Sequence, residues 1–113
     1  FKKEKSDLDV PLDDDMGNRG YAAALEAHLD LVYDRSKPDL VIYLAGVDVM
    51  DGDRFGRLKL TRSGLANRER IVLESARRRA LPISLVLSGG YAKTAKMTAD
   101  LHATVHREAK ALF

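Results

Sequence analysis

Two side chains that could do chemistry follow two apolar segments of the sequence. Asp48 comes three residues after Ala45, which ends one segment, and Tyr91 comes four residues after Leu87, which ends the other. If both segments are neighbouring strands of one parallel sheet, about 4.8 Å apart, both side chains can reach one crevice. Open α/β sheets bind ligands beyond the carboxyl ends of their strands. Asp48 and Tyr91 are therefore the first candidates for a functional site.

The loop that contains Asp48 carries two further carboxylates, Asp51 and Asp53. An EF-hand that began at Asp48 would need an acidic or amide side chain at Met50 and a bidentate Glu at Lys59, so this calcium site is excluded. We interpret Asp51 and Asp53 as solvated turn residues.

The histidines are weaker candidates. His102 and His106 stand four residues apart, which is the spacing of a zinc-binding helix, but Ala103 occupies the position where the metalloprotease motif needs Glu. We interpret both residues, and His28 in an earlier helix, as structural histidines. The turn at residues 88–91 contains two glycines but lacks the lysine and the spacing of a P-loop.

Three segments have apolar residues at helical spacing and are predicted helices. The first begins at Asn18 as N-cap and ends at Ser36-Lys37-Pro38, the second follows Thr61 as N-cap, and the third follows the turn at residues 88–91. Arg77-Arg78-Arg79 suits the negative end of the second helix dipole. The predicted inward-facing residues are Tyr21, Leu25, Leu29, Val32 and Tyr33 in the first helix, Leu65, Val72, Leu73, Ala76 and Ala80 in the second, and Met97, Leu101, Val105, Ala109 and Leu112 in the third.

Residues 39–45 and 83–87 are predicted strands, because they are short apolar runs bounded by Pro and Gly or Ser-Gly. Their character is that of strands buried on both faces, and with the helix between them they form a parallel βαβ unit. Residues 46–60 show no periodicity, and a loop of that length in a compact domain is usually functional. Residues 1–17 are expected to be an extended connector with one short strand.

Length and composition exclude several classes of protein. The 113 residues suit one small domain, and 45% hydrophobic with 32% charged residues is typical of a globular chain. No apolar run approaches the roughly 20 residues of a membrane span, and we expect a cytoplasmic protein. A net charge of +2 is too small for a protein that binds nucleic acid by neutralising phosphates. Without cysteine, any metal must be held by Asp, Glu or His.

Several short motifs, taken together, resemble the histone deacetylase superfamily. The resemblance runs from about Val10 to Leu101, and Ser88 with Lys93 makes it most similar to the class IV branch and its bacterial relatives. The motifs are Val10-Pro11-Leu12, Lys37-Pro38-Asp39-Leu40-Val41, Ala45-Gly46-Val47-Asp48, Gly52-Asp53-Arg54, Leu58-Lys59-Leu60-Thr61 and Ser88-Gly89-Gly90-Tyr91.

This resemblance implies an α/β fold: the C-terminal portion of an arginase/deacetylase domain, with a mostly parallel sheet of about eight strands flanked by helices. It also implies that Asp48 is a metal ligand, that Tyr91 is the catalytic tyrosine, and that Gly89 and Gly90 form the turn that brings Tyr91 over the substrate. The implied cofactor is zinc, with its other ligands upstream of Phe1. The implied substrate is an acetylated lysine or another acetylated amine.

The two predicted strands need neighbours on each side, because they would otherwise leave apolar sheet edges open. We therefore expect residues 1–113 to be the C-terminal portion of a single deacetylase domain, without a second domain. On this hypothesis the chain belongs to a zinc-dependent deacetylase and is inactive alone. The alternative is a non-enzymatic α/β fragment or interaction module that retains only the family packing. Neither the particular substrate nor the oligomeric state follows from the sequence.

Overall fold

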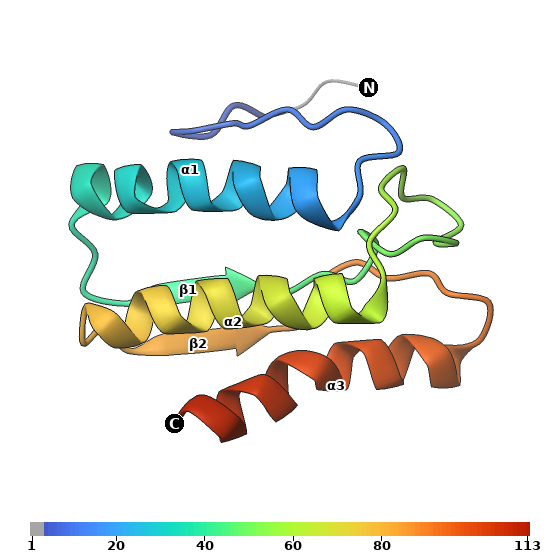
Figure 1. Ribbon diagram of the computed structural model, residues 1–113. Coiled ribbons are helices and arrows are strands. Elements are labelled where there is room, and N and C mark those ends of the chain that lie inside the picture. The colour runs from blue at the N-terminus through green and yellow to red at the C-terminus, as the bar shows by residue number, and fades with distance from the viewer. Residues whose placement is uncertain (1–3) are drawn as a thin grey trace.

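The computed structural model describes residues 4–113, in which helices and strands follow the predicted order (Figure 1). The elements are α1 (Asn18–Ser36), β1 (Val41–Leu44), α2 (Arg62–Arg78), β2 (Ile83–Val86) and α3 (Ala95–Leu112). Residues 4–17 contain no strand, so that part of the connector prediction was wrong; residues 1–3 lie outside the described part. None of the helices in residues 4–113 combines the length and apolar character that crossing a bilayer requires.

The two strands pair in parallel, as predicted. Val41 lies opposite Ile83 and Leu44 opposite Val86, and the Ala45 N–H continues the ladder by donating to the Val86 carbonyl at 3.0 Å. Figure 1 shows both arrowheads directed to the same end of the molecule, where residues 46–60 and 87–94 lie. The parallel pairing therefore brings the segments that follow the two strands to one place.

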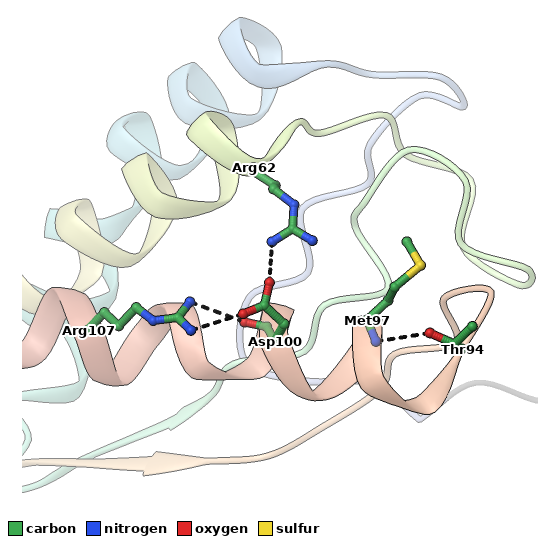
Figure 2. Close-up of polar contacts among 5 residues, drawn as sticks. All are labelled: Arg62, Thr94, Met97, Asp100 and Arg107. Atoms are coloured by element: carbon green, nitrogen blue, oxygen red, sulfur yellow. Dashed lines mark hydrogen bonds and ion pairs between the residues drawn. The ribbon is translucent and has the colours of Figure 1, made fainter.

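The helix boundaries follow from local backbone chemistry. Lys37 adopts a left-handed conformation, with φ 43°, directly before Pro38, and this ends α1. At the start of α2, the Thr61 hydroxyl accepts a hydrogen bond from the Gly64 N–H at 3.3 Å, as its predicted capping role requires. Thr94 caps α3 in the same way through the Met97 N–H at 3.1 Å (Figure 2).

Asn18 is not the N-cap of α1 but its first helical residue, after Gly17. Its side chain instead reaches the start of α2, 43 residues later in the chain. The amide oxygen accepts from the Thr61 N–H at 3.0 Å, and the amide nitrogen donates to the Thr61 hydroxyl at 2.8 Å. The side-chain atoms of Asn18 that could have capped α1 are therefore used in a contact with the start of α2.

Charged side chains connect the helices at their exposed faces. Asp100 on α3 accepts from Arg62 at 2.6 Å and from Arg107 at 2.9 Å (Figure 2). These two hydrogen bonds lower the pKa of Asp100. At the other end of α2, Arg79 pairs with Asp30 at 2.6 Å and lies 4.3 Å from the centre of the Tyr33 ring. The last arginine of the basic triplet thus connects α2 to α1.

Most of the predicted inward-facing residues of α2 and α3 lie in the core. Leu65, Val72, Leu73 and Ala76 of α2 are buried, and so are Leu101 and Val105 of α3. On α1, the predicted inward-facing Val32 is instead 40% exposed. Two predictions for α2 and α3 were also wrong. Ala80 lies beyond the end of α2 with φ 54° and is exposed, because the helix has already ended. Met97, in the first turn of α3, is 40% exposed.

The prediction that both faces of the strands are buried was also wrong for the described chain. Tyr43, Ile83 and Leu85 pack towards α2 and α3 around Leu73 and Val105. On the opposite face, Ile42 is 60% and Leu44 63% exposed. Among residues 4–113, helices cover only one face of the sheet.

Candidate functional site

The segment after β1 is ordered although it lacks periodicity. Met50 and Leu60 are buried and form an isolated parallel bridge, with the Leu60 N–H donating to the Val49 carbonyl at 3.0 Å. The Val47 N–H donates to the Gly89 carbonyl at 2.7 Å and so joins this segment to the turn after β2. The two segments that carry Asp48 and Tyr91 are therefore in direct contact.

The Asp48 carboxylate lies against the backbone of Gly89. A Cβ atom at residue 89 would stand only 2.3 Å from Asp48 Oδ2. Within residues 4–113, no hydrogen bond or ion pair reaches this half-buried carboxylate. Asp48 therefore has both oxygens available for a ligand.

The two turn glycines, Gly89 and Gly90, are required because a Cβ atom would clash with neighbouring atoms. They are not required by a left-handed backbone conformation. A Cβ at Gly90 would lie 2.4 Å from a methyl carbon of Val47. Gly52 is the glycine with positive φ in the described chain, at 88°, whereas Gly89 and Gly90 have ordinary φ values. The close approach of the segment 46–48 thus explains both glycines.

Tyr91 follows these glycines and projects from the surface, with 46% of its area exposed. Its ring meets the Phe55 ring edge to face, with centroids 4.8 Å apart. It borders an open cavity of about 660 Å³ whose lining includes Lys93, His102 and His106. Within residues 4–113, the Tyr91 hydroxyl makes no hydrogen bond, so it is available to donate one.

Asp53 joins the loop after β1 to the turn at Tyr91, a contact that we did not predict. Its Oδ1 accepts from the N–H groups of Phe55 at 2.9 Å and Gly56 at 2.8 Å, as expected of a turn residue. Its Oδ2 accepts from the Tyr91 N–H at 2.7 Å. Partial burial alone would raise the pKa of Asp53, but the N–H donors, with Arg54 nearby, hold that pKa below its usual value.

A buried ion pair on α2 supports the same region. Arg68 and Glu69 are 4% and 1% exposed, and Arg68 Nε donates to Glu69 Oε1 at 2.7 Å. Arg68 Nη1 donates to the Gly46 carbonyl at 2.7 Å, two residues before Asp48, and the Tyr43 hydroxyl donates to Glu69 at 3.2 Å. Burial raises the pKa of Glu69 in spite of Arg68 beside it. The sequence offered one signal, because Glu69 falls on the inward stripe between Leu65 and Val72.

The histidines and acidic residues do not form a metal site by themselves. The His28 ring bonds to the Ala24 carbonyl of its own helix at 2.6 Å. In the described part of the chain, no three side chains of His, Asp or Glu are grouped so that they could hold a metal. A catalytic zinc takes three protein ligands. Asp48 has the chemistry of one such ligand, but residues 4–113 do not complete the set.

Comparison with known proteins identifies relatives of the whole chain. The family model described as "Histone deacetylase domain" matches residues 2–107. An uncharacterized protein of Picosynechococcus sp. (strain ATCC 27264 / PCC 7002 / PR-6) is 40% identical over 112 residues, which are 99% of this chain and 37% of that protein. Histone deacetylase 2 of Arabidopsis thaliana is 38% identical over 81 residues, covering 71% of this chain and 21% of that protein. The chain thus spans well under half the length of these relatives.

The fold has a counterpart among solved structures. The structure of the histone deacetylase Clr3 matches with a TM-score of 0.67 and 24% identity, over 87% of this chain and 16% of that one. The parallel pair of strands with its helices therefore corresponds to part of a deacetylase fold, as the sequence predicted.

Proposed function

This chain belongs to the histone deacetylase family, and from that premise we propose that the intact protein is a zinc-dependent amide hydrolase. Its substrate is an acetylated lysine or a similar acetylated amine. Ser88 and Lys93 beside the Gly-Gly-Tyr turn favour the class IV branch, a placement that a family tree of the intact sequence would test. Asp48 is the proposed metal ligand and Tyr91 the proposed catalytic residue.

One observation carries the proposal most directly. The Asp48 carboxylate lies against Gly89, and Tyr91 follows two residues later; within residues 4–113 neither that carboxylate nor the Tyr91 hydroxyl has a hydrogen-bond partner. Neither polar group is used in the internal packing of residues 4–113, so both can bind a ligand. Both residues follow the carboxyl ends of two paired parallel strands, where open α/β sheets bind ligands, and this placement supports a shared site.

Each residue has a defined chemical task in this proposal. Zinc, when bound, polarises the amide carbonyl and makes a hydroxide available near neutral pH. Asp48 contributes one oxygen ligand to it. The Tyr91 hydroxyl donates a hydrogen bond to the oxygen of the amide carbonyl as negative charge develops there. Gly89 and Gly90 leave the turn thin enough for Asp48 and the substrate to approach.

Two substitutions in the intact protein test these roles. We expect Tyr91→Phe to lower kcat by about 10²–10³, the usual effect of losing one oxyanion donor. We expect Asp48→Ala to abolish deacetylation and to lower the zinc content. The measurements are release of acetate from an acetyl-lysine peptide and metal analysis of the purified protein.

Matched controls separate these effects from general damage. Asp51→Ala removes an exposed carboxylate from the same loop, and Tyr21→Phe removes a hydroxyl that has no hydrogen-bond partner in residues 4–113. Both variants should keep full activity. Unchanged activity in both Asp48→Ala and Tyr91→Phe would contradict the proposal.

The alternative function is a non-enzymatic module that keeps only the family packing. The observation in its favour is that residues 4–113 offer Asp48 but no cluster of three metal-ligating side chains. Metal analysis of the intact protein decides between the two. A purified intact protein without zinc, and without activity after zinc is added, would favour the module.

A further inference from the structure

Three consecutive residues of the loop after β1 hold Tyr91. The Asp53 carboxylate accepts from the Tyr91 N–H at 2.7 Å. The Arg54 N–H donates to the Tyr91 carbonyl at 3.1 Å. The Phe55 ring packs against the Tyr91 ring with centroids 4.8 Å apart and an angle of 89° between the planes. Both backbone groups and the ring of Tyr91 are therefore fixed by one short segment.

We propose that Asp53 is the positioning residue for Tyr91, fixing its backbone and thereby the place of its hydroxyl relative to Asp48. This inference rests on the proposed function, in which that hydroxyl serves the reaction. Asp53 does not itself touch the substrate in this proposal. It acts through Tyr91.

Asp53 suits this task because its own position is fixed on the Asp48 side of the site. Its Oδ1 is bonded to the N–H groups of Phe55 and Gly56. Gly56 in turn packs so tightly under the Asp48 carbonyl that a Cβ would lie 1.8 Å from that oxygen. The carboxylate therefore spans from the Asp48 loop to the Tyr91 turn.

The tyrosine side chain has few other constraints. It is 46% exposed, and Phe55, its ring partner, is itself exposed. Within residues 4–113 the Tyr91 hydroxyl has no hydrogen-bond partner. The location of the hydroxyl therefore depends on the Tyr91 backbone and on the Phe55 ring, and Asp53 supplies the charge-assisted hydrogen bond to that backbone.

The substitution Asp53→Asn is a sharp test because it keeps the size of the side chain. An amide oxygen can replace Oδ1 and retain the bonds from Phe55 and Gly56. The amide nitrogen then faces the Tyr91 N–H, donor against donor, and cannot accept from it. The loop turn is preserved, whereas the contact with Tyr91 is lost.

Kinetics of the intact protein test the catalytic consequence. We expect Asp53→Asn to lower kcat roughly 10- to 100-fold, the scale of a displaced catalytic group, with little change in KM. In the Tyr91→Phe background the same substitution should change kcat less than about twofold, because the hydroxyl that it displaces is already absent. The control Asp51→Asn, in an exposed position of the same loop, should have no effect. An equal loss of kcat in both backgrounds would overturn the proposal.

Amide hydrogen exchange tests the contact without using activity. In the unaltered protein, the Tyr91 N–H should exchange more slowly than the Lys93 N–H, which makes no hydrogen bond within residues 4–113. Asp53→Asn should remove this protection. Exchange of Tyr91 as fast as that of Lys93 in the unaltered protein would overturn the proposal even if the variant does not fold. If Tyr91→Phe keeps full activity while Tyr91 is protected only when Asp53 is present, the proposed function fails and the contact stands.

Discussion

Gly89 shows how one residue sets the geometry of the candidate site. Its carbonyl is held by the Val47 N–H at 2.7 Å, and the space where a Cβ would lie is taken by the Asp48 carboxylate. The hydrogen bond with Val47 holds the backbone of Gly89 in place, so a Cβ at residue 89 would push the Asp48 carboxylate aside, which no hydrogen bond holds within residues 4–113. Glycine is thus required here by contact between two segments.

We expect Gly89→Ala to lower kcat/KM of the intact protein by about 10²-fold or more, because the added methyl group displaces the Asp48 carboxylate. The measurement is deacetylation of an acetyl-lysine peptide, with the melting temperature recorded alongside. Gly17→Ala is the control, since its Cβ would meet nothing closer than the Lys59 carbonyl at 3.9 Å. If Gly89→Ala retains activity at an unchanged melting temperature, the crowding of Asp48 is without functional effect.

Asp53 illustrates what residue types reveal about a site and what they do not. The bonds from Phe55 and Gly56, two and three residues away, confirm Asp53 as a turn residue. The expectation that its carboxylate is solvated was wrong, because both oxygens accept backbone hydrogen bonds and the residue is half-buried. The bond from Tyr91 crosses 38 residues. Local preference cannot predict such a contact, because it depends on how β1 and β2 are paired.

At the scale of the elements, α2 holds a charged pair in the core. Arg68 and Glu69 bond to one another; the Tyr43 hydroxyl connects the pair to β1, and the Gly46 carbonyl connects it to the second residue after β1. An ion pair in such a place is costly to desolvate, and losing one partner leaves the other charge buried alone. The pair connects the packing of α2 to the loop that carries Asp48.

We expect Arg68→Met to lower the free energy of unfolding by about 3–5 kcal/mol, since Glu69 would remain buried without its cation. The double substitution Arg68→Met with Glu69→Leu should lower the free energy of unfolding by less, because it leaves no unpaired charge. Thermal or urea unfolding of the intact protein measures both.

The matched control is Arg57→Met. Arg57 pairs with Asp14 at 3.7 Å, and the two side chains are 78% and 67% exposed. Exposed pairs contribute at most about 1 kcal/mol, so this variant should unfold almost as the unaltered protein does. If the double variant at residues 68 and 69 is as unstable as Arg68→Met alone, the loss of stability does not come from an unpaired charge on Glu69.

The helices and strands were predicted well because each has a strong local signal. Apolar spacing identified α1, α2 and α3, and short β-branched runs identified the two strands. The predictions failed at the ends of elements. Asn18 bonds to Thr61 instead of capping its own helix, and Ala80 lies past the end of α2. The cause at Asn18 is a contact with another element, and at Ala80 it is a left-handed backbone; periodicity records neither.

For the whole molecule, the main feature is an uncovered sheet face. Ile42, Leu44 and Val86 are exposed on the side opposite to α2 and α3, and the sheet of residues 4–113 has two strands. Two strands alone are marginal in water. The expectation that more strands and helices complete this sheet stays a prediction, supported by relatives of which the chain spans 37% and 21%.

We expect the 113-residue chain, prepared by itself, to retain no zinc and to show no deacetylase activity. The reason is that residues 4–113 do not group three metal-ligating side chains, whereas a zinc site needs at least three. The measurement is zinc content after dialysis against a weak chelator, with Asp48→Ala as the matched variant. Stoichiometric zinc that is lost in Asp48→Ala would contradict this prediction.

Sequence patterns alone were enough to predict the order of the elements, the parallel βαβ unit, the family and the first candidate residues, Asp48 and Tyr91. These follow from local patterns, because apolar spacing and short motifs are properties of neighbouring residues. The three-dimensional packing was needed to show that Asp53 holds Tyr91, that Gly89 makes room for Asp48 and that Arg68 supports Gly46. These contacts join segments far apart in the chain, and no local pattern records them. The bare sheet face likewise appears only once the helices are seen to pack on the other side.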